Sequence, residues 1–126
     1  MCCVLGYAGH DLSKEKFTEL LMRTASRGPD DQRVAETEFG LLGFGRLAIM
    51  GLTPEGMQPF FRGADCVACN GELYGFRFEK EVLKRRGYKF QSDCDCEILL
   101  PLYYEYGLDM FRHMDAEFAL ILYDSR

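Results

Sequence analysis

The sequence has no long apolar run, no internal repeat and no low-complexity tract. No stretch approaches the ~20 apolar residues that a membrane-spanning helix needs. The first residues lack the basic start and the longer apolar segment of a secretory signal. We therefore expect a cytoplasmic protein that has no membrane partner.

Basic residues are also in short supply, with 15 Lys and Arg against 20 Asp and Glu and a net charge of −5. This balance argues against nucleic acid or an anionic membrane surface as the main partner. Disulfides are rare in cytosolic proteins, so we expect the six cysteines to be free thiols.

Apolar residues make up 48% of the 126 residues and aromatic residues 13%, which predicts one folded domain. Periodicity and turn residues predict strands at 3–9, 39–50, 64–74 and 116–124, and helices at 13–25, 77–87, 97–107 and 108–114. An Asn-Gly turn signal lies near the end of the third strand. The alternation of strands with helices predicts an α+β fold whose sheets are buried against helices.

The cysteine spacing is a weak signal for metal. Cys66 and Cys69 form a C-x-x-C, but positions three apart on a strand point to opposite faces. Cys94 and Cys96 form a C-x-C just before a predicted helix. We expect small buried thiols and no metal site.

The chain opens with Met1-Cys2-Cys3, and removal of Met1 would make Cys2 the N-terminal residue. One residue would then carry a thiol nucleophile and, on the same carbon, an α-amine whose pKa of about 7.7–8.0 suits a general base. Cys3 cannot do this, because its nitrogen is an amide.

Acyl transfer also needs oxyanion donors, and Asn70 with Gly71 offers a side-chain amide and a backbone N–H. Arg46, in an otherwise apolar strand, could hold a carboxylate or simply face solvent. Glu72 and Asp95 could hold an ammonium group or cap a helix.

In this order the features resemble the glutamine amidotransferase domain of class II, whose nucleophile is an N-terminal cysteine, and within that class the glutamine-hydrolysing asparagine synthetases. The segments that carry the resemblance are MCCVLGYAG at the start, RGPDD at 27–31, GRLAIM at 45–50, QPF at 58–60, NGELY at 70–74, SDCDCEILL at 92–100 and AEFALILYD at 116–124.

The resemblance implies that Cys2 attacks the side-chain amide of glutamine, while Asn70 and Gly71 form the oxyanion hole. It implies an αββα sandwich of two antiparallel sheets, the N-terminal-nucleophile hydrolase fold, with Cys2 opening a central strand. By the same resemblance, Arg46 would hold the α-carboxylate of glutamine, and Asp95 with Glu72 its α-ammonium group.

The family's domain normally continues with further strands, and a synthetase domain that uses ATP and Mg²⁺ follows it. We therefore expect residues 1–126 to be an incomplete glutaminase domain that needs no cofactor itself and leaves its last strand with a free edge for a homodimer or another domain. Gly45 and Gly75 stand where the family usually has polar residues. The alternatives are a separate amidotransferase-like domain with another acceptor, and an inactive domain that only binds glutamine or assists assembly.

Overall fold

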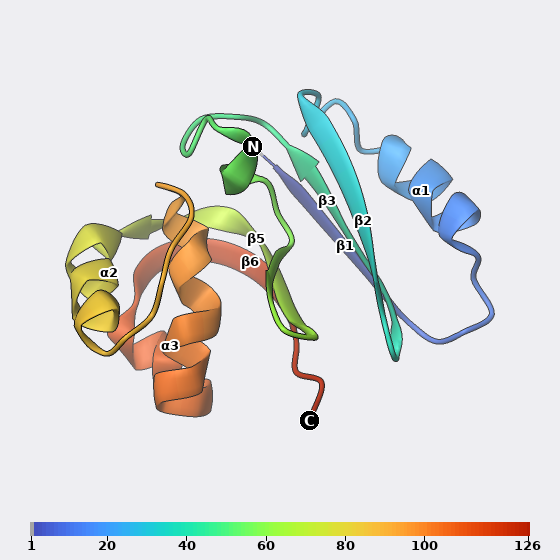
Figure 1. Cartoon of the computed structure of the whole chain (residues 1–126). Coiled ribbons are helices and arrows are strands. Elements are labelled where there is room, and N and C mark those ends of the chain that lie inside the picture. The colour runs from blue at the N-terminus through green and yellow to red at the C-terminus, as the bar shows by residue number, and fades with distance from the viewer. Residues whose placement is uncertain (1) are drawn as a thin grey trace.

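The computed structural model describes residues 2–126, which form two antiparallel sheets stacked between helices (Figure 1). Helix α1 (Lys14–Met22) covers the outer face of one sheet, whereas α2 (Phe76–Arg85) and α3 (Leu99–Tyr106) lie on the outer side of the other. The predicted α+β sandwich is therefore confirmed. No helix in the described part of the chain has the length and apolar character required to cross a membrane.

The first sheet has the order β1-β3-β2, formed by β1 (Cys3–Ala8), β2 (Asp31–Thr37) and β3 (Gly40–Arg46). The prediction that Cys2 opens a central strand is wrong within residues 2–126, where β1 lies at the edge of its sheet. β3 occupies the centre because it pairs with β2 through the hairpin and with β1 on its other side. Within residues 2–126, the outer edge of β1 has no strand beside it.

The second sheet has the order β4-β5-β6, formed by β4 (Phe60–Arg62), β5 (Asp65–Tyr74) and β6 (Asp115–Tyr123). β6 pairs only with β5 among the residues described, so its other edge is free as expected. The turn predicted at Asn70-Gly71 is wrong. These two residues lie in the middle of β5, opposite Ala119 and Phe118 of β6, because the long pairing with β6 keeps this segment extended.

Helix α1 begins where the sequence predicts, at a Ser13 N-cap whose Oγ accepts a hydrogen bond from the Lys16 N–H at 3.2 Å. Phe17 and Leu21 are fully buried on the face that meets β3. A side chain at Gly43 would collide with Phe17, with its Cβ only 2.8 Å from that ring. This glycine therefore lets the helix approach the sheet closely.

The remaining elements are three short 3₁₀ segments, η1 (Pro54–Gly56), η2 (Asp95–Ile98) and η3 (Gly107–His113). The sequence predicts a loop around η1, a helix across most of η3, and at η2 a loop that gives way to a helix only at residue 97. Residues 107–113 wind as 3₁₀ turns and not as the predicted α-helix.

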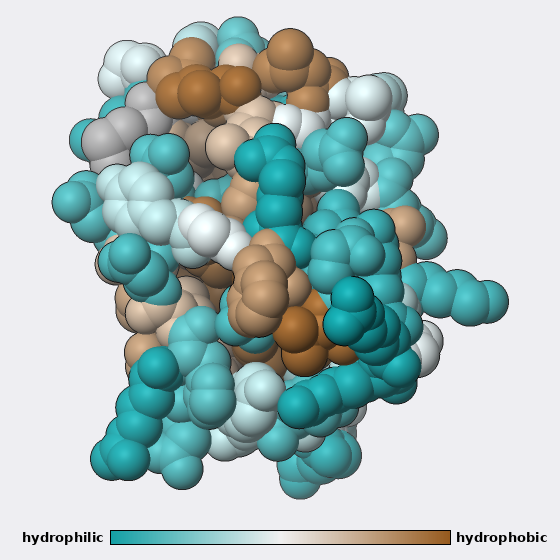
Figure 2. Space-filling view, turned by 90° about the vertical axis from the view of Figure 1, so that its left-hand side faces the viewer, coloured by the Kyte–Doolittle hydropathy of each residue, from teal (hydrophilic) through white to brown (hydrophobic). Residues whose placement is uncertain are grey.

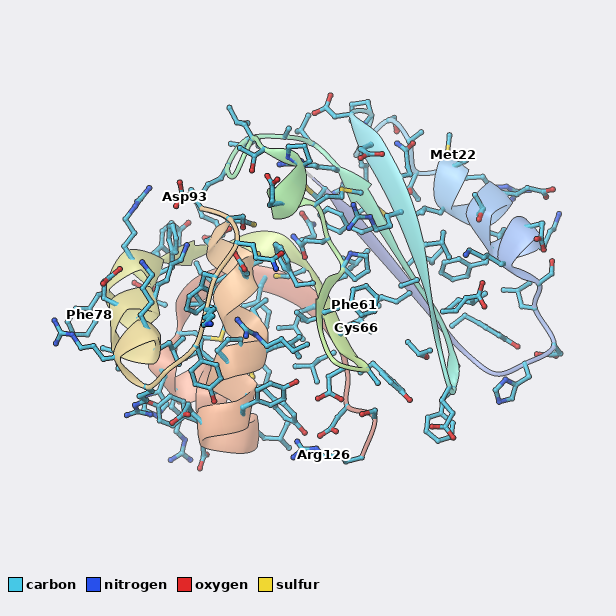
Figure 3. The ribbon with its side chains drawn as sticks, viewed as in Figure 1. Met22, Phe61, Cys66, Phe78, Asp93 and Arg126 are labelled. Atoms are coloured by element: carbon cyan, nitrogen blue, oxygen red, sulfur yellow. The ribbon has the colours of Figure 1, made fainter. Side chains whose placement is uncertain are left out.

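The two cores lie on opposite faces of β5, and its cysteines divide between them. Cys66 lies in the core between the sheets with Leu42, Phe44 and Ala68 (Figure 3). Cys69 lies in the core between the second sheet and helices α2 and α3. The prediction that these two cysteines face apart, and so do not form a chelating pair, is confirmed.

Candidate active site

A cavity of about 250 Å³ opens where the end of β3, the middle of β5 and the start of η2 meet. The structure brings all the predicted site residues to its wall, namely Cys2, Arg46, Asn70, Gly71, Glu72 and Asp95. The volume is below the ~300–1,000 Å³ typical of pockets for drug-sized ligands. The cavity therefore suits a small molecule the size of an amino acid.

The Cys2 thiol is held against the chain that leaves β3. Its Sγ accepts a hydrogen bond from the Leu47 N–H at 3.3 Å and lies 3.4 Å from the Leu47 carbonyl oxygen. Cys2 is half-buried, so the thiol faces the cavity without being sealed from it. The expected loss of Met1 concerns a residue outside those that the structure describes.

Asn70 and Gly71 reach the cavity from the middle of β5. In the described part of the chain, the Asn70 carboxamide has no side-chain hydrogen bond, which leaves its N–H groups available to a ligand. A Cβ on Gly71 would lie 2.7 Å from Cβ of Phe118 and would also collide with the Glu117 carbonyl. Only glycine lets β5 and β6 approach this closely beside the cavity.

Arg46 is the last residue of β3 and only 8% exposed, so the solvent-facing interpretation is wrong. Its guanidinium donates hydrogen bonds to the Thr53 carbonyl, at 3.2 Å, and to the Gly51 carbonyl. These bonds fix the loop between β3 and η1 over the cavity. No carboxylate within residues 2–126 forms an ion pair with Arg46, so its positive charge remains available to an anionic group.

Asp95 is the first residue of η2 and is 5% exposed. Its Oδ2 accepts the Leu73 N–H at 2.8 Å, and its Oδ1 accepts the Cys96 N–H at 2.9 Å. These bonds tie η2 to β5 and fix the direction of the carboxylate. Glu72 lies exposed on β5 and therefore caps no helix.

The loop that carries Asp95 depends on a second buried acid, Glu97, whose role the sequence alone does not reveal. Its carboxylate accepts the backbone N–H groups of Gln91 and Ser92 at 2.7 and 2.9 Å, and the Ser92 hydroxyl at 2.7 Å. Lys80 closes the same loop by donating to the Ser92 carbonyl at 2.5 Å. The hydrogen bonds of Glu97 and Lys80 therefore hold the segment that carries Asp95 in a fixed conformation.

Negative charge gathers at one end of the cavity. Glu117 of β6 stands directly opposite Glu72 of β5, and both line the cavity with Asp95. Glu117, and then Glu72, raise the pKa of the neighbouring Tyr74 hydroxyl. With Arg46 as the cation, the wall offers a positive group for a carboxylate and a negative group for an ammonium.

Gln58 is a further buried polar residue beside the cavity whose role the sequence alone does not reveal. Its side chain is 4% exposed, and its Nε2 donates to the Cys69 carbonyl at 3.0 Å while its Oε1 accepts the Cys69 N–H at 2.7 Å. The β4–β5 register, Phe60 with Val67, would place Gln58 opposite Cys69. Its carboxamide thus replaces one backbone pair of the sheet, immediately before Asn70.

Three thiols besides Cys2 line the same cavity: Cys69, Cys94 and Cys96. Hydrogen bonds with the Cys69 and Cys94 thiols, and then burial, raise the pKa of Cys96 well above its ordinary value. All six cysteines of the chain are free, as expected.

Exposed apolar side chains lie on the loop that follows Arg46, and two of them, Ile49 and Met50, line the cavity. Ile49 is 73% exposed and Leu52 70%, and both belong to the loop that Arg46 holds. Figure 2 shows apolar side chains gathered at the top of the molecule, where Figure 1 places the start of β1 and this loop.

The sequence matches the glutamine amidotransferase domain family over residues 1–126. The chain belongs to this family. It is 37% identical over 128 residues to a probable glutamine-hydrolysing asparagine synthetase of Acanthamoeba polyphaga mimivirus, covering 97% of this chain and 23% of that protein. It is 39% identical over 114 residues to the amidase chry2 of Gibberella zeae, covering 87% and 17% respectively.

A third relative, the glutamine-hydrolysing asparagine synthetase 2 of Oryza sativa subsp. japonica, is 37% identical over 126 residues, covering 98% of this chain and 21% of the relative. The amidotransferase chain therefore spans about a fifth of the length of these curated relatives. The family resemblance inferred from the sequence motifs is confirmed.

Proposed function

We propose that this amidotransferase domain hydrolyses glutamine to glutamate and ammonia through the Cys2 thiol. The sulfur attacks the side-chain carboxamide carbon, and the oxyanion that forms accepts hydrogen bonds from Asn70 and Gly71. The carbon–nitrogen bond then breaks, and the nitrogen takes a proton and leaves as ammonia. Water attacks the resulting thioester, which releases glutamate and restores the thiol.

One observation supports this mechanism above the others: Cys2, at the start of the chain, shares a cavity with Asn70 and Gly71 from the middle of β5. The hydrogen bonds of Cys2 Sγ to Leu47 hold the sulfur at this wall. In the proposal, removal of Met1 frees the α-amine of Cys2, which then takes the thiol proton.

The charges of the cavity support glutamine as the substrate. Arg46 would bind the α-carboxylate with the N–H groups that do not hold the loop carbonyls. Asp95 and Glu72 would bind the α-ammonium, and Glu117 adds negative charge at the same end. A site with both charges selects an amino acid over an uncharged amide.

We further propose that the ammonia serves a larger enzyme. The mimivirus and rice relatives support an asparagine synthetase, in which a separate synthetase domain would use ATP and Mg²⁺ to activate aspartate. The free edges of β1 and β6 are where such a domain or a second copy would pair. Six free thiols are consistent with a cytoplasmic setting.

The Gibberella zeae amidase supports a second candidate, an amidotransferase that delivers ammonia to another acceptor. Both candidates share the same glutamine chemistry. Ammonia-dependent formation of asparagine from aspartate and ATP by the full-length protein separates them. Asparagine formation favours the first candidate, and its absence in a protein that hydrolyses glutamine favours the second.

A glutamine-analogue electrophile tests the shared chemistry. Intact-mass analysis should show that one methionine is missing, and peptide mapping should locate a single adduct on Cys2. Cys2→Ala should abolish the adduct, whereas Cys3→Ala, the matched change at the next residue, should keep it. A retained Met1, or an adduct on Cys94 in place of Cys2, would contradict the proposed mechanism.

A further inference from the structure

The proposed glutamine chemistry leaves three buried thiols of the cavity wall unused. Cys69 belongs to β5, whereas Cys94 and Cys96 flank Asp95 at the start of η2. Their exposed fractions are 1%, 6% and 2%, yet all three line the cavity that opens to solvent. They therefore combine the burial of a structural site with an entry path for a small ligand.

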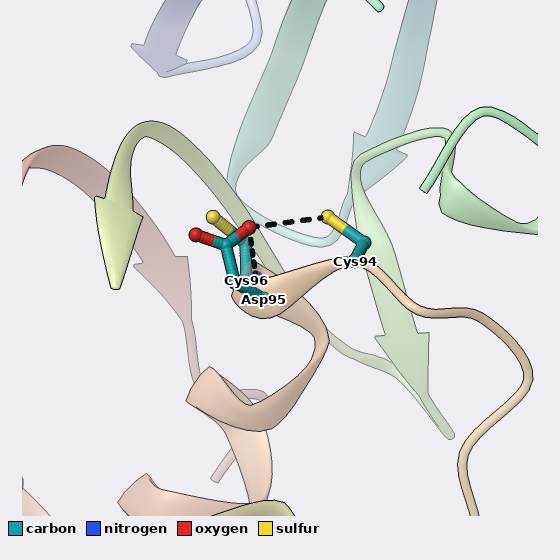
Figure 4. Close-up of side chains that lie close together, drawn as sticks. All are labelled: Cys94, Asp95 and Cys96. Carbon is teal, nitrogen blue, oxygen red and sulfur yellow. Dashed lines mark hydrogen bonds between the residues drawn. The ribbon is translucent and has the colours of Figure 1, made fainter. Parts of the chain in front are cut away.

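The ligand atoms of this loop converge. Sγ of Cys94, a carboxylate oxygen of Asp95 and Sγ of Cys96 all lie within 4.8 Å of one another (Figure 4). Sγ of Cys94 is 3.6 Å from Oδ1 of Asp95. Sulfur ligands of a tetrahedral zinc ion lie roughly 3.8 Å apart, given zinc–sulfur bonds of about 2.3 Å. Side-chain shifts of about 1 Å or less would bring the three atoms to these positions.

Cys69 lines the same cavity and is the candidate for a fourth ligand, although its Sγ is outside the group of three converging atoms. It lies on β5, to which the start of η2 is tied by the hydrogen bond from the Leu73 N–H to Asp95 at 2.8 Å. Its backbone is fixed by the two hydrogen bonds to Gln58. One carboxylate and three sulfurs from two rigid segments make a donor set that soft cations prefer over Mg²⁺ or Ca²⁺.

We propose that Cys69, Cys94, Cys96 and Asp95 form a binding site for a thiophilic divalent cation, Zn²⁺ or Cd²⁺. The spacing of the cysteines along the sequence predicts no metal site, so this proposal departs from that prediction. In the sequence, only the C-x-C of Cys94 and Cys96 points to this site. The third cysteine, Cys69, lies on a strand, and the sequence spacing does not show that this strand is near the C-x-C. Each coordinated thiol releases its proton to solvent, and no oxidation or reduction is involved.

Metal and glutamine should exclude each other, and this part rests on the proposed function. Asp95 is the buried carboxylate proposed to bind the α-ammonium of glutamine, and a carboxylate that coordinates a divalent cation no longer attracts an ammonium group. The cation would therefore act as a reversible inhibitor of glutamine hydrolysis, and glutamine would weaken cation binding.

Cd²⁺ alone is the probe for the direct test, because cadmium thiolates absorb in the ultraviolet where free thiols do not. Titration of the reduced full chain should give one tight Cd²⁺ with thiolate absorption. Cys94→Ser and Cys96→Ser should each weaken binding at least tenfold. Cys66→Ser is the matched control, since this buried cysteine faces the core between the sheets, and should leave binding unchanged.

X-ray absorption of the wild-type Cd²⁺ complex gives a second measurement that does not depend on the folding of any variant. Two or three sulfur neighbours are expected. A shell of oxygen and nitrogen only, or binding abolished by Cys3→Ser but not by Cys96→Ser, would overturn the metal site.

Competition by glutamine separates this proposal from the proposed function. Cd²⁺ binding that glutamine does not weaken would support the metal site and would count against Asp95 as the ammonium ligand. Glutamine hydrolysis with no Cd²⁺ bound at the thiols would leave the proposed function standing and would refute the metal site.

Discussion

Replacing the Gln58 carboxamide by an apolar group should destabilise the domain far more than the same substitution at an exposed glutamine. Gln58→Leu keeps most of the side-chain volume but leaves the buried N–H and C=O of Cys69 without partners. An unsatisfied buried backbone group costs about 1–3 kcal/mol, and the added apolar contacts of leucine offset a part of the two costs. We expect a loss of about 3 kcal/mol in the free energy of unfolding.

Urea unfolding of the full chain at 25 °C measures this loss against a typical domain stability of about 5–15 kcal/mol. Gln91→Leu is the matched control, because the Gln91 side chain is exposed and makes no hydrogen bond within residues 2–126. It should change stability by less than about 0.5 kcal/mol. A Gln58→Leu loss as small as that of the control would refute the idea that this side chain completes the sheet.

An isosteric substitution adds a pH test. In Gln58→Glu, the side chain can still accept the Cys69 N–H, but only its protonated form can donate to the Cys69 carbonyl. Folding therefore favours the protonated acid and raises its pKa above the unfolded value of about 4.3. The variant should approach wild-type stability below that value and lose stability as the pH rises through the folded pKa. A loss independent of pH would contradict this account.

Two further substitutions test the site and the chain end. Arg46→Ala should raise the KM for glutamine through the loss of an ion pair worth a few kcal/mol when desolvated, and unchanged KM in steady-state kinetics would refute the carboxylate role. Hydrogen bonds from the Tyr104 hydroxyl, and then from Ser125, lower the pKa of Asp65 below its ordinary 3.8. A carboxyl whose pKa is lowered by folding stabilises the fold above pH 3.8, and this stabilisation is lost as the pH falls further. Asp65→Asn should therefore reduce the free energy of unfolding by about 1–3 kcal/mol at pH 7 and by less at pH 2.5. Urea unfolding at both values checks this, with Asp115→Asn as control, because Asp115 is exposed and its side chain makes no ion pair or hydrogen bond within residues 2–126.

The sequence predicts the elements that carry their own apolar pattern. The strands around β1, β5 and β6 and helices α1 and α2 all lie where periodicity places them. β2 was missed because only Val34 and Ala35 interrupt its polar residues. It is extended because it pairs with β3 along its whole length, and such pairing cannot be recognised from the polar segment alone.

The residues of the candidate site also fall into those that the sequence predicts and those that it does not. Residue types predicted Cys2, Asn70, Arg46 and Asp95, because a nucleophile, an amide and opposite charges have recognisable chemistry. Gln58 and Glu97 were missed as positioning residues because they form hydrogen bonds with backbone groups of adjacent segments of the same chain. Any polar residue in a loop could form such bonds. Their importance appears only when burial and partners are known.

The hydrogen bonds around the cavity explain how a residue as close to the start of the chain as Cys2 is held in a fixed position. A terminus frays unless the fold ties it down. Here the Cys2 sulfur accepts a hydrogen bond from the Leu47 N–H. Leu47 begins the loop whose carbonyls Arg46 holds by hydrogen bonds, and Arg46 is itself the last residue of the central strand β3. The residue proposed to bind the substrate carboxylate thus also fixes the loop beside the proposed nucleophile. Glutamine binding at Arg46 would therefore be coupled directly to the position of the thiol, since a shift of the guanidinium moves the carbonyls that it holds.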